Sequence, residues 1–324
     1  MLTSESDSCL SSRSELMLKI TELIIPSIGF EQTQVNVEED LIGDGTMAFE
    51  LLVKMPIENN WDFSFEVEVD PASSDGYLLA NSNACTIEVV DFVAGADAKV
   101  KLTIDKSKLD FGLQTVPLRI KSCEYPGFEI NSTQSLAVVT FHKTVSRSEL
   151  SEISVPAENI DGYGWATYDW MPDGSGYVTN LGWGSASEIY DGKGKSALFD
   201  GNLDTFWHGD WCYGANHELY GQYIDFKLTN PATHFAYDLW ARHDNQNACP
   251  KVTDVYGSTD GQNWVKLKTV KSSLSQPREK FESSVCSSST PFNYIRFAVI
   301  ESNNGDVRQS KITWSCGEMK LYAK

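Results

Sequence analysis

The chain has 324 residues, which is enough for two domains that each bury a sizeable core. Aspartate and glutamate number 45 against 26 lysines and arginines, and a formal net charge of -19 disfavours binding to phosphate backbones or anionic lipids. We therefore expect no nucleic-acid partner. Hydrophobic residues make up 41% of the chain and aromatic residues 11%, too many for a disordered polyanion, and no apolar run of about eighteen residues predicts a transmembrane segment.

The composition changes near Pro156. Residues 1–156 carry 25 acidic and 11 basic side chains and residues 157–324 carry 20 and 15, so most of the excess negative charge lies in the first part. Of the nine tryptophans only Trp61 precedes Pro156. The segment before Pro156 is polar and serine-rich, as exposed linkers are. We predict an N-terminal domain over residues 1–145, a linker over 146–156 and a C-terminal domain over 157–324.

Apolar residues alternate with polar residues in both parts, which predicts an all-β protein. In the first part the expected strands lie at 63–69, 100–104 and 116–120. Short strands separated by turn residues favour an immunoglobulin-like sandwich. In the second part the expected strands lie at 224–228, 235–239, 265–267, 295–299 and 319–321. They favour a jelly-roll β-sandwich with long polar loops, where function usually lies. Residues 16–25 fit either a helical turn or a first strand.

The seven cysteines form no C-x-x-C pair, which argues against zinc ribbons and thioredoxin-type sites. An odd number leaves one thiol unpaired in a monomer, and Cys9 in the polar tail is the expected one. A lipid anchor at Cys9 is an alternative, although Ser6-Asp7-Ser8 is a poor lipobox. Residues 1–13 resemble no export signal, so we expect any signal to be missing from this sequence.

The segment from Asp200 to Trp211 concentrates oxygen donors. Asp200, Asn202, Asp204 and Thr205 place four side-chain oxygens within six residues, and calcium prefers such ligands. An EF-hand is excluded, because Thr205 and Trp211 stand where glycine and glutamate are required. The alternative to calcium is an Asx-turn in which Asp200 caps its own backbone.

Four motifs in this half together resemble the discoidin family, also called coagulation factor V/VIII type C domains. They are Asp200-Gly-Asn-Leu-Asp-Thr-Phe-Trp-His208, Tyr256-Gly-Ser-Thr-Asp-Gly-Gln-Asn-Trp264, Asn293-Tyr-Ile-Arg-Phe297 and Gly317-Glu-Met-Lys-Leu-Tyr322. The resemblance spans about residues 157–324 and is closest to family 32 carbohydrate-binding modules. It implies a galactose-binding-like jelly roll with a structural calcium ion.

The resemblance also assigns site residues. For calcium it implies the side chains of Asp200, Thr205 and Glu318 and the carbonyl groups of Ala197, Asn202 and Gly317. For a sugar it implies His208, Trp211 and Arg242, with Asp191 and Asn247 as weaker contributors. These residue types suit the task, because an aromatic ring covers the C–H face of a pyranose while charged and amide groups bond its hydroxyls.

The sequence departs from the family pattern at this site. Asp191 stands where a longer glutamate is usual, and Cys212 and Cys249 fall in the two loops that carry the sugar residues. The family brings these loops together, so we expect either a disulfide between the two cysteines or two buried thiols. Another hypothesis is a zinc site made of His208, Cys212, His217 and Cys249. Tryptophans in so aromatic a domain are more often core residues than sugar platforms, and no role is assigned to Trp165, Trp170 and Trp183.

No catalytic motif of hydrolases or nucleotide-binding enzymes is present, and we expect no enzyme activity. The N-terminal domain loosely resembles the immunoglobulin-like modules of bacterial surface glycan-binding lipoproteins, through residues 92–100 and 116–120. Together the resemblances imply an exported protein of the bacterial cell surface or periplasm, lipid-anchored in its full-length precursor. They also imply that it binds galactose or N-acetylhexosamine termini of glycans, and that its partners include other outer-membrane glycan-utilisation proteins. The alternatives are an accessory fragment of a modular glycoside hydrolase, a protein-binding adhesion module and, least favoured, a phospholipid-binding domain.

Overall fold

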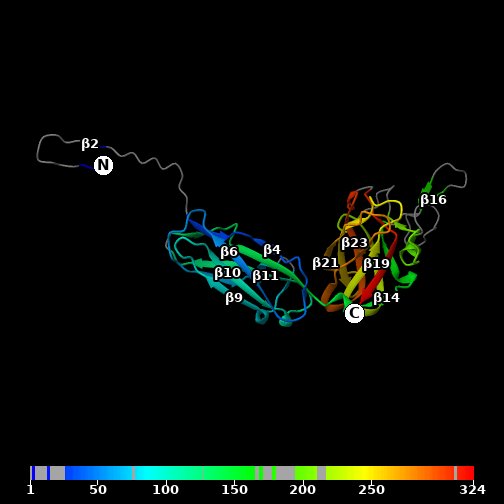
Figure 1. Ribbon diagram of the computed structural model, residues 1–324, viewed down its shortest axis with the longest axis horizontal. Helices are drawn as coiled ribbons and strands as arrows, with labels where there is room; N and C mark the ends of the chain where they lie inside the picture. Colours follow the sequence, from blue (N-terminus) through cyan, green and yellow to red (C-terminus); the bar gives the residue numbers. More distant parts are fainter. Residues whose placement is uncertain are drawn as a thin grey trace.

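The computed structural model describes residues 26–74, 77–125, 127–164, 194–209, 217–309 and 312–324. It also assigns four short strands outside these ranges, namely β1 (Leu2–Thr3), β2 (Arg13–Ser14), β16 (Tyr168–Trp170) and β17 (Tyr177–Thr179). The chain forms two β-domains joined at one end (Figure 1). The helical segments of the described residues are short 3₁₀ turns: η1 (Pro71–Ser73), η2 (Ser82–Ala84), η3 (Lys106–Lys108), η4 (Arg147–Glu149), η5 (Ala157–Asn159) and η6 (Gly194–Leu198). None of these could cross a membrane. The predicted all-β class is confirmed.

The N-terminal domain is a sandwich of two sheets. The first has the order β12 (Glu129–Ile130), β3 (Ser27–Phe30), β6 (Thr46–Lys54), β10 (Ala98–Asp105) and β9 (Cys85–Val90). The second has the order β4 (Gln34–Asn36), β13 (Leu136–Thr144), β11 (Gly112–Cys123) and β7 (Phe65–Val69), with β5 (Leu41–Ile42) paired to β13 and β8 (Leu78–Leu79) paired to β11.

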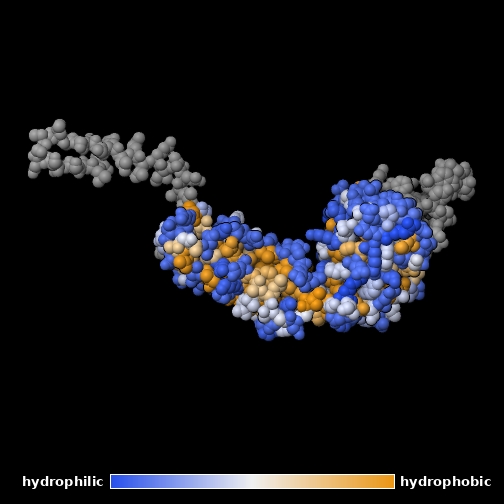
Figure 2. Space-filling model, in the orientation of Figure 1, coloured by the Kyte–Doolittle hydropathy of each residue, from blue (hydrophilic) through white to orange (hydrophobic). Residues whose placement is uncertain are grey.

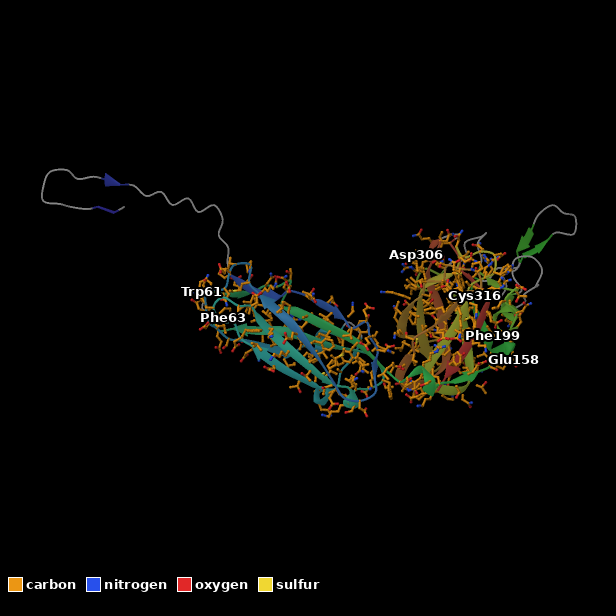
Figure 3. The ribbon with its side chains drawn as sticks, viewed as in Figure 1. Trp61, Phe63, Glu158, Phe199, Asp306 and Cys316 are labelled. Carbon is orange, nitrogen blue, oxygen red and sulfur yellow. The ribbon has the colours of Figure 1, made fainter. Side chains whose placement is uncertain are left out.

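The predicted alternation accounts for the core of this sandwich. Every second residue of β10 is buried, because side chains of a strand point to opposite faces of the sheet. Val69, the last residue of β7, is exposed. Trp61 and Phe63 lie at the end of the domain away from the C-terminal half (Figure 3), where Trp61 packs edge-on against Phe128.

The C-terminal domain is built on a nine-stranded sheet. Its main order is β14 (Ser151–Ile153), β26 (Glu318–Ala323), β19 (Gln222–Trp240), β23 (Cys286–Ser302), β20 (Pro250–Ser258) and β21 (Val265–Lys271). Three short strands complete it: β15 (Ile160–Tyr163) and β22 (Lys280–Glu282) pair with β19, and β24 (Gly305–Asp306) pairs with β23. A separate pair, β18 (Trp207–His208) and β25 (Ser315–Cys316), contributes Trp207 and Cys316 to the same core.

Two features of this sheet differ from the sequence-based expectation. The strands predicted at 224–228 and 235–239 form one strand, β19, whose pairing with β23 shifts register between Lys227 and Ala232. Asn230 and Pro231 lie within this irregular part of the pairing and do not end the strand. In addition, the predicted linker contributes β14 to the sheet, and Arg147 donates to the Ser283 carbonyl at 2.5 Å, so this segment is docked on the C-terminal domain.

Buried polar groups join the two domains. The Ser287 hydroxyl lies 2.6 Å from the Thr144 hydroxyl and 2.8 Å from His234 Nδ1. The Asp40 carboxylate accepts from Lys268 Nζ at 2.5 Å and from His142 Nδ1 at 2.9 Å. Because buried polar groups are costly unless they are paired, this network fixes the domains in one relative position.

His142 should make this junction sensitive to acid. Its Nε2 accepts the backbone N–H of Ser287 at 3.3 Å, which requires a neutral ring, and burial lowers the pKa of His142 despite the opposing effect of Asp40. The folded state disfavours protonation of His142. The contribution of His142 to the free energy of unfolding is therefore complete above its ordinary pKa of 6.5 and is lost as the pH falls through the lowered pKa. Melting temperatures measured from pH 7.5 to 5 should fall more steeply for wild type than for His142→Asn. Parallel slopes would contradict this role.

Candidate functional site

Strand β18 and the turn before it hold the residues expected to bind calcium. Trp207 is fully buried and its ring centroid lies 4.1 Å from that of Trp314, which anchors this end of the turn in the core. Asp200 Oδ1 accepts the N–H of Asn202 at 2.8 Å, and Asp200 Oδ2 accepts the Thr205 hydroxyl at 2.7 Å. The Asx-turn given as the alternative is therefore present, and it brings Asp200 and Thr205 together.

Glu318, at the start of β26 and 117 residues further along the chain, closes this turn. Its Oε2 accepts the N–H of Gly201 at 2.8 Å, and its carboxyl group also contacts that of Asp200. Burial and the neighbouring Asp200 raise the pKa of Glu318 to about 7. Within the described residues neither carboxylate has an ion-pair partner, whereas Asp204 beside them pairs with Arg278.

This arrangement fits a hard cation. Two carboxyl groups face each other, one of them almost fully buried, and a cation would remove the cost of ionising both. Ala197 is buried, and the Asn202 carbonyl already turns inward to the Thr205 hydroxyl at 2.8 Å. A calcium ion would be held by the side chains and carbonyl groups named from the sequence, and it would supply charge neutralisation that ties the turn to β26.

Arg242, two residues after β19 ends at Trp240, is the best-defined member of the expected sugar site. Its Nε and Nη2 donate to the two carboxylate oxygens of Asp244 at 2.9 and 3.1 Å. Burial acts to raise the pKa of Asp244, but Arg242 outweighs it and the pKa is lowered. The guanidinium carbon lies 3.5 Å from the centroid of the Phe206 ring. These contacts hold a 5% exposed guanidinium in one orientation.

His208 also lies near Phe206. The ring centroids of His208 and Phe206 are 6.4 Å apart, and that of His243 lies 6.2 Å from Phe206. His208 Nδ1 lies 2.6 Å from the Gly209 carbonyl oxygen, which can only accept, so Nδ1 is the donor in this contact. The structure therefore brings His208 and Arg242 together around one aromatic ring.

The remaining sugar residues are less well placed. Asn247 is exposed in the loop that carries Arg242, and its backbone N–H donates to Asn245 Oδ1 at 3.0 Å. Asp191 and Trp211 lie outside the described residues, as do Trp165 and Trp183.

Phe206, His243 and Asp244 belong to this site but were not predicted from the sequence. Phe206 immediately precedes the recognised Trp-His pair, and Asp244 lies two residues after Arg242, a spacing that permits a local bidentate ion pair. Phe206 and Asp244 could have been proposed from these positions in the sequence.

The zinc hypothesis is not supported, and Cys249 follows the second of the two alternatives expected for the thiols, a buried free thiol. His208, His217 and Cys249 do not gather, and the described residues contain no group of three potential zinc ligands from histidine, cysteine, aspartate and glutamate. Cys249 is a free, fully buried thiol and not the partner of Cys212, which lies outside the described residues. Cys316 is likewise free and lies inside the domain (Figure 3). Burial raises the pKa of Cys249 to about 11, which keeps it protonated and unreactive.

Residues 184–311 match the family model of the F5/8 type C domain, which confirms the resemblance seen in the sequence. The matched residues lie within the C-terminal domain. No curated protein matches the chain.

Several solved structures are similar. A two-domain protein of unknown function from Bacteroides fragilis shares 16% identity over 92% of this chain and 94% of its own, with a TM-score of 0.35. The module CpGH89CBM32-5 from Clostridium perfringens, in complex with GalNAc-β-1,3-galactose, shares 19% identity over 53% of this chain and 100% of its own, with a TM-score of 0.34. The family 32 module of NanJ from C. perfringens, in complex with galactose, shares 14% identity over 53% of this chain and 99% of its own, with a TM-score of 0.33.

Proposed function

We propose that the protein is a non-catalytic glycan-binding protein of the cell surface, and that its C-terminal domain recognises galactose or N-acetylhexosamine termini. The observation that carries this proposal is the fixed guanidinium of Arg242 beside His208, on an F5/8 type C domain. Asp244 is neutralised by Arg242, which suits hydrogen bonding to a neutral sugar better than acid-base catalysis. Lipid anchoring and contact with other outer-membrane glycan-utilisation proteins belong to the same proposal.

Recognition would divide between three side chains. Arg242 Nη1 makes no hydrogen bond within the described residues and would donate to sugar hydroxyls, while the His208 ring would contact the sugar beside it. Phe206 has one face covered by Arg242, so Trp211 is the ring proposed to stack on the pyranose, with Asp191 and Asn247 at the edge. The calcium ion proposed at Asp200, Asn202, Thr205 and Glu318, with Ala197 and Gly317, would hold the turn that leads into His208.

A shallow site of this kind should bind weakly. We expect a Kd on the order of 1 mM to 10 μM, or about -4 to -7 kcal/mol. Several copies on one surface would supply avidity.

Substitutions at the site test the proposal. Trp211→Ala should remove the stacking ring and Arg242→Ala the charged donor, and each should abolish binding of a galactose-terminated oligosaccharide in titration calorimetry. Arg308→Ala is a matched control, because Arg308 pairs with Asp306 through the same two-residue spacing at an exposed turn. If both site variants bind as wild type does, the sugar site lies elsewhere.

A further inference from the structure

A hollow of about 390 Å³ lies where the two domains meet. Figure 2 shows the recess between the domains, with hydrophobic surface near its base. The N-terminal domain supplies residues of β8 and the start of β11, and the C-terminal domain supplies β21 and the first residues of β23. The lining consists of Tyr77, Leu78, Phe111, Gly112, Leu113, Val265, Lys266, Leu267 and Ser287 to Thr290. Its volume falls within the range of small-molecule sites, about 300–1,000 Å³.

The walls of this hollow are held by the polar junction. Ser287, which lines the hollow, carries the hydroxyl bonded to Thr144 and His234. Phe111 also lines it, and its ring packs edge-on against His234 with centroids 4.8 Å apart. The hollow therefore requires both domains and keeps its shape while they stay docked.

The lining exposes apolar side chains and neutral hydroxyl groups. Tyr77 is 42% exposed, Leu78 45% and Val265 67%, so three of the most exposed large hydrophobic residues of the described chain meet here. Ser289 and Thr290 are exposed, and their hydroxyls make no hydrogen bond within the described residues. An accessible aromatic ring beside unused hydroxyls is the combination that binds the C–H faces and hydroxyls of sugars.

The charged side chains that line the hollow indicate which class of ligand it can bind. Among the described residues, the lining contains no carboxylate and one cation, Lys266, which directs its ammonium group to Asp254 at 2.7 Å. Binding of a charged ligand would leave its charge uncompensated, so the hollow favours a neutral one.

The hollow continues along the sheet edge. A neighbouring space of about 280 Å³ shares Val265, Leu267, Ser288 and Thr290 with it and adds the polar side chains of Ser258, Thr259 and Asn263. In the described sheet β21 is an edge strand, so this side of the groove is open. Two adjoining spaces of about 390 and 280 Å³ suit a chain of sugar units better than a single sugar.

From these observations we infer that the domain junction is a second glycan-binding groove, which takes a neutral oligosaccharide and is separate from the Arg242 site. Tyr77 supplies the stacking ring, and Ser289 and Thr290 supply hydrogen bonds. The inference does not depend on the proposed terminal-sugar site.

The test uses the full chain carrying Arg242→Ala, which silences the other site. An immobilised panel of neutral oligosaccharides of three to six sugar units is the probe. We expect this protein to retain at least one panel member, and we expect Tyr77→Ala or Val265→Trp to lower that affinity at least tenfold. Tyr77→Phe keeps the ring and should bind, and Val93→Ala is a control at an exposed apolar residue outside the groove.

Unchanged melting temperatures would show that the variants are folded. The inference is overturned if the Arg242→Ala protein retains no neutral oligosaccharide, or if Tyr77→Ala and Val265→Trp bind as their parent does. Binding of extended apolar peptides in place of saccharides would also overturn it. Loss of all binding in Arg242→Ala, with wild type still binding, would contradict this groove while supporting the proposed function.

Discussion

Removing calcium should lower the melting temperature of the wild-type protein and leave that of Asp200→Ala almost unchanged. A ligand that binds only the folded state stabilises it by about 2.7 kcal/mol at one hundred times its Kd. For a domain of this size that corresponds to about 5–10 °C. Asp200 is the residue to change, because its carboxylate contacts both Thr205 and Glu318. Melting curves with calcium and with a chelator measure the difference.

Asp260→Ala is the matched control. Asp260 caps a similar turn by accepting the N–H groups of Gln262 and Asn263, each at 2.8 Å, but Glu318 does not face it. Its loss should destabilise the protein equally with and without calcium. If chelation shifts wild type and Asp200→Ala by the same amount, the calcium assignment is wrong.

Trp314→Ala should cause the largest loss of stability, about 3–5 kcal/mol, or about 6–20 °C in the melting of the C-terminal domain. The indole is fully buried, lies against Trp207 and Phe297, and donates from Nε1 to the Gln222 carbonyl at 2.9 Å. Truncation would leave a cavity and an unpaired acceptor. The burial also shows that Trp314 is not a second sugar platform on the surface.

Trp264→Ala provides the comparison. Trp264 is partly exposed and covers the Arg296 guanidinium at 4.1 Å, so its loss should cost clearly less than that of Trp314. Differential scanning calorimetry of both variants measures the two costs. Equal losses would contradict the assignment of Trp314 to the core.

The sequence predicted the fold class because strand side chains alternate, and this signal is local. The sequence-based prediction failed where contacts between distant segments decide the structure. Asn230-Pro231 carries a turn signal, yet β19 continues through it because its two ends pair with different neighbours, β15 and β26. The docking network of Asp40, His142, Lys268 and Ser287 has no pattern in the sequence, since its members come from four distant segments.

At the candidate site, too, local contacts could be predicted from the sequence and contacts between distant segments could not. The Asp200 to Thr205 turn could be predicted because its hydrogen bonds lie within six residues, whereas Glu318 came only from family resemblance. The contact of Phe206 with Arg242 depends on β18 and the end of β19 meeting in the folded domain. Residue types alone indicated a sugar site, but they could not show which aromatic ring faces the ligand and which one supports the arginine.

The most direct test of the central claim is a glycan-array screen of the full chain in calcium-containing buffer, with Arg242→Ala screened alongside. We predict that wild type binds glycans ending in galactose or N-acetylgalactosamine, and that Arg242→Ala loses these signals while keeping its calcium-dependent melting. The account is contradicted if wild type binds no such terminus, or if Arg242→Ala binds the same termini equally well.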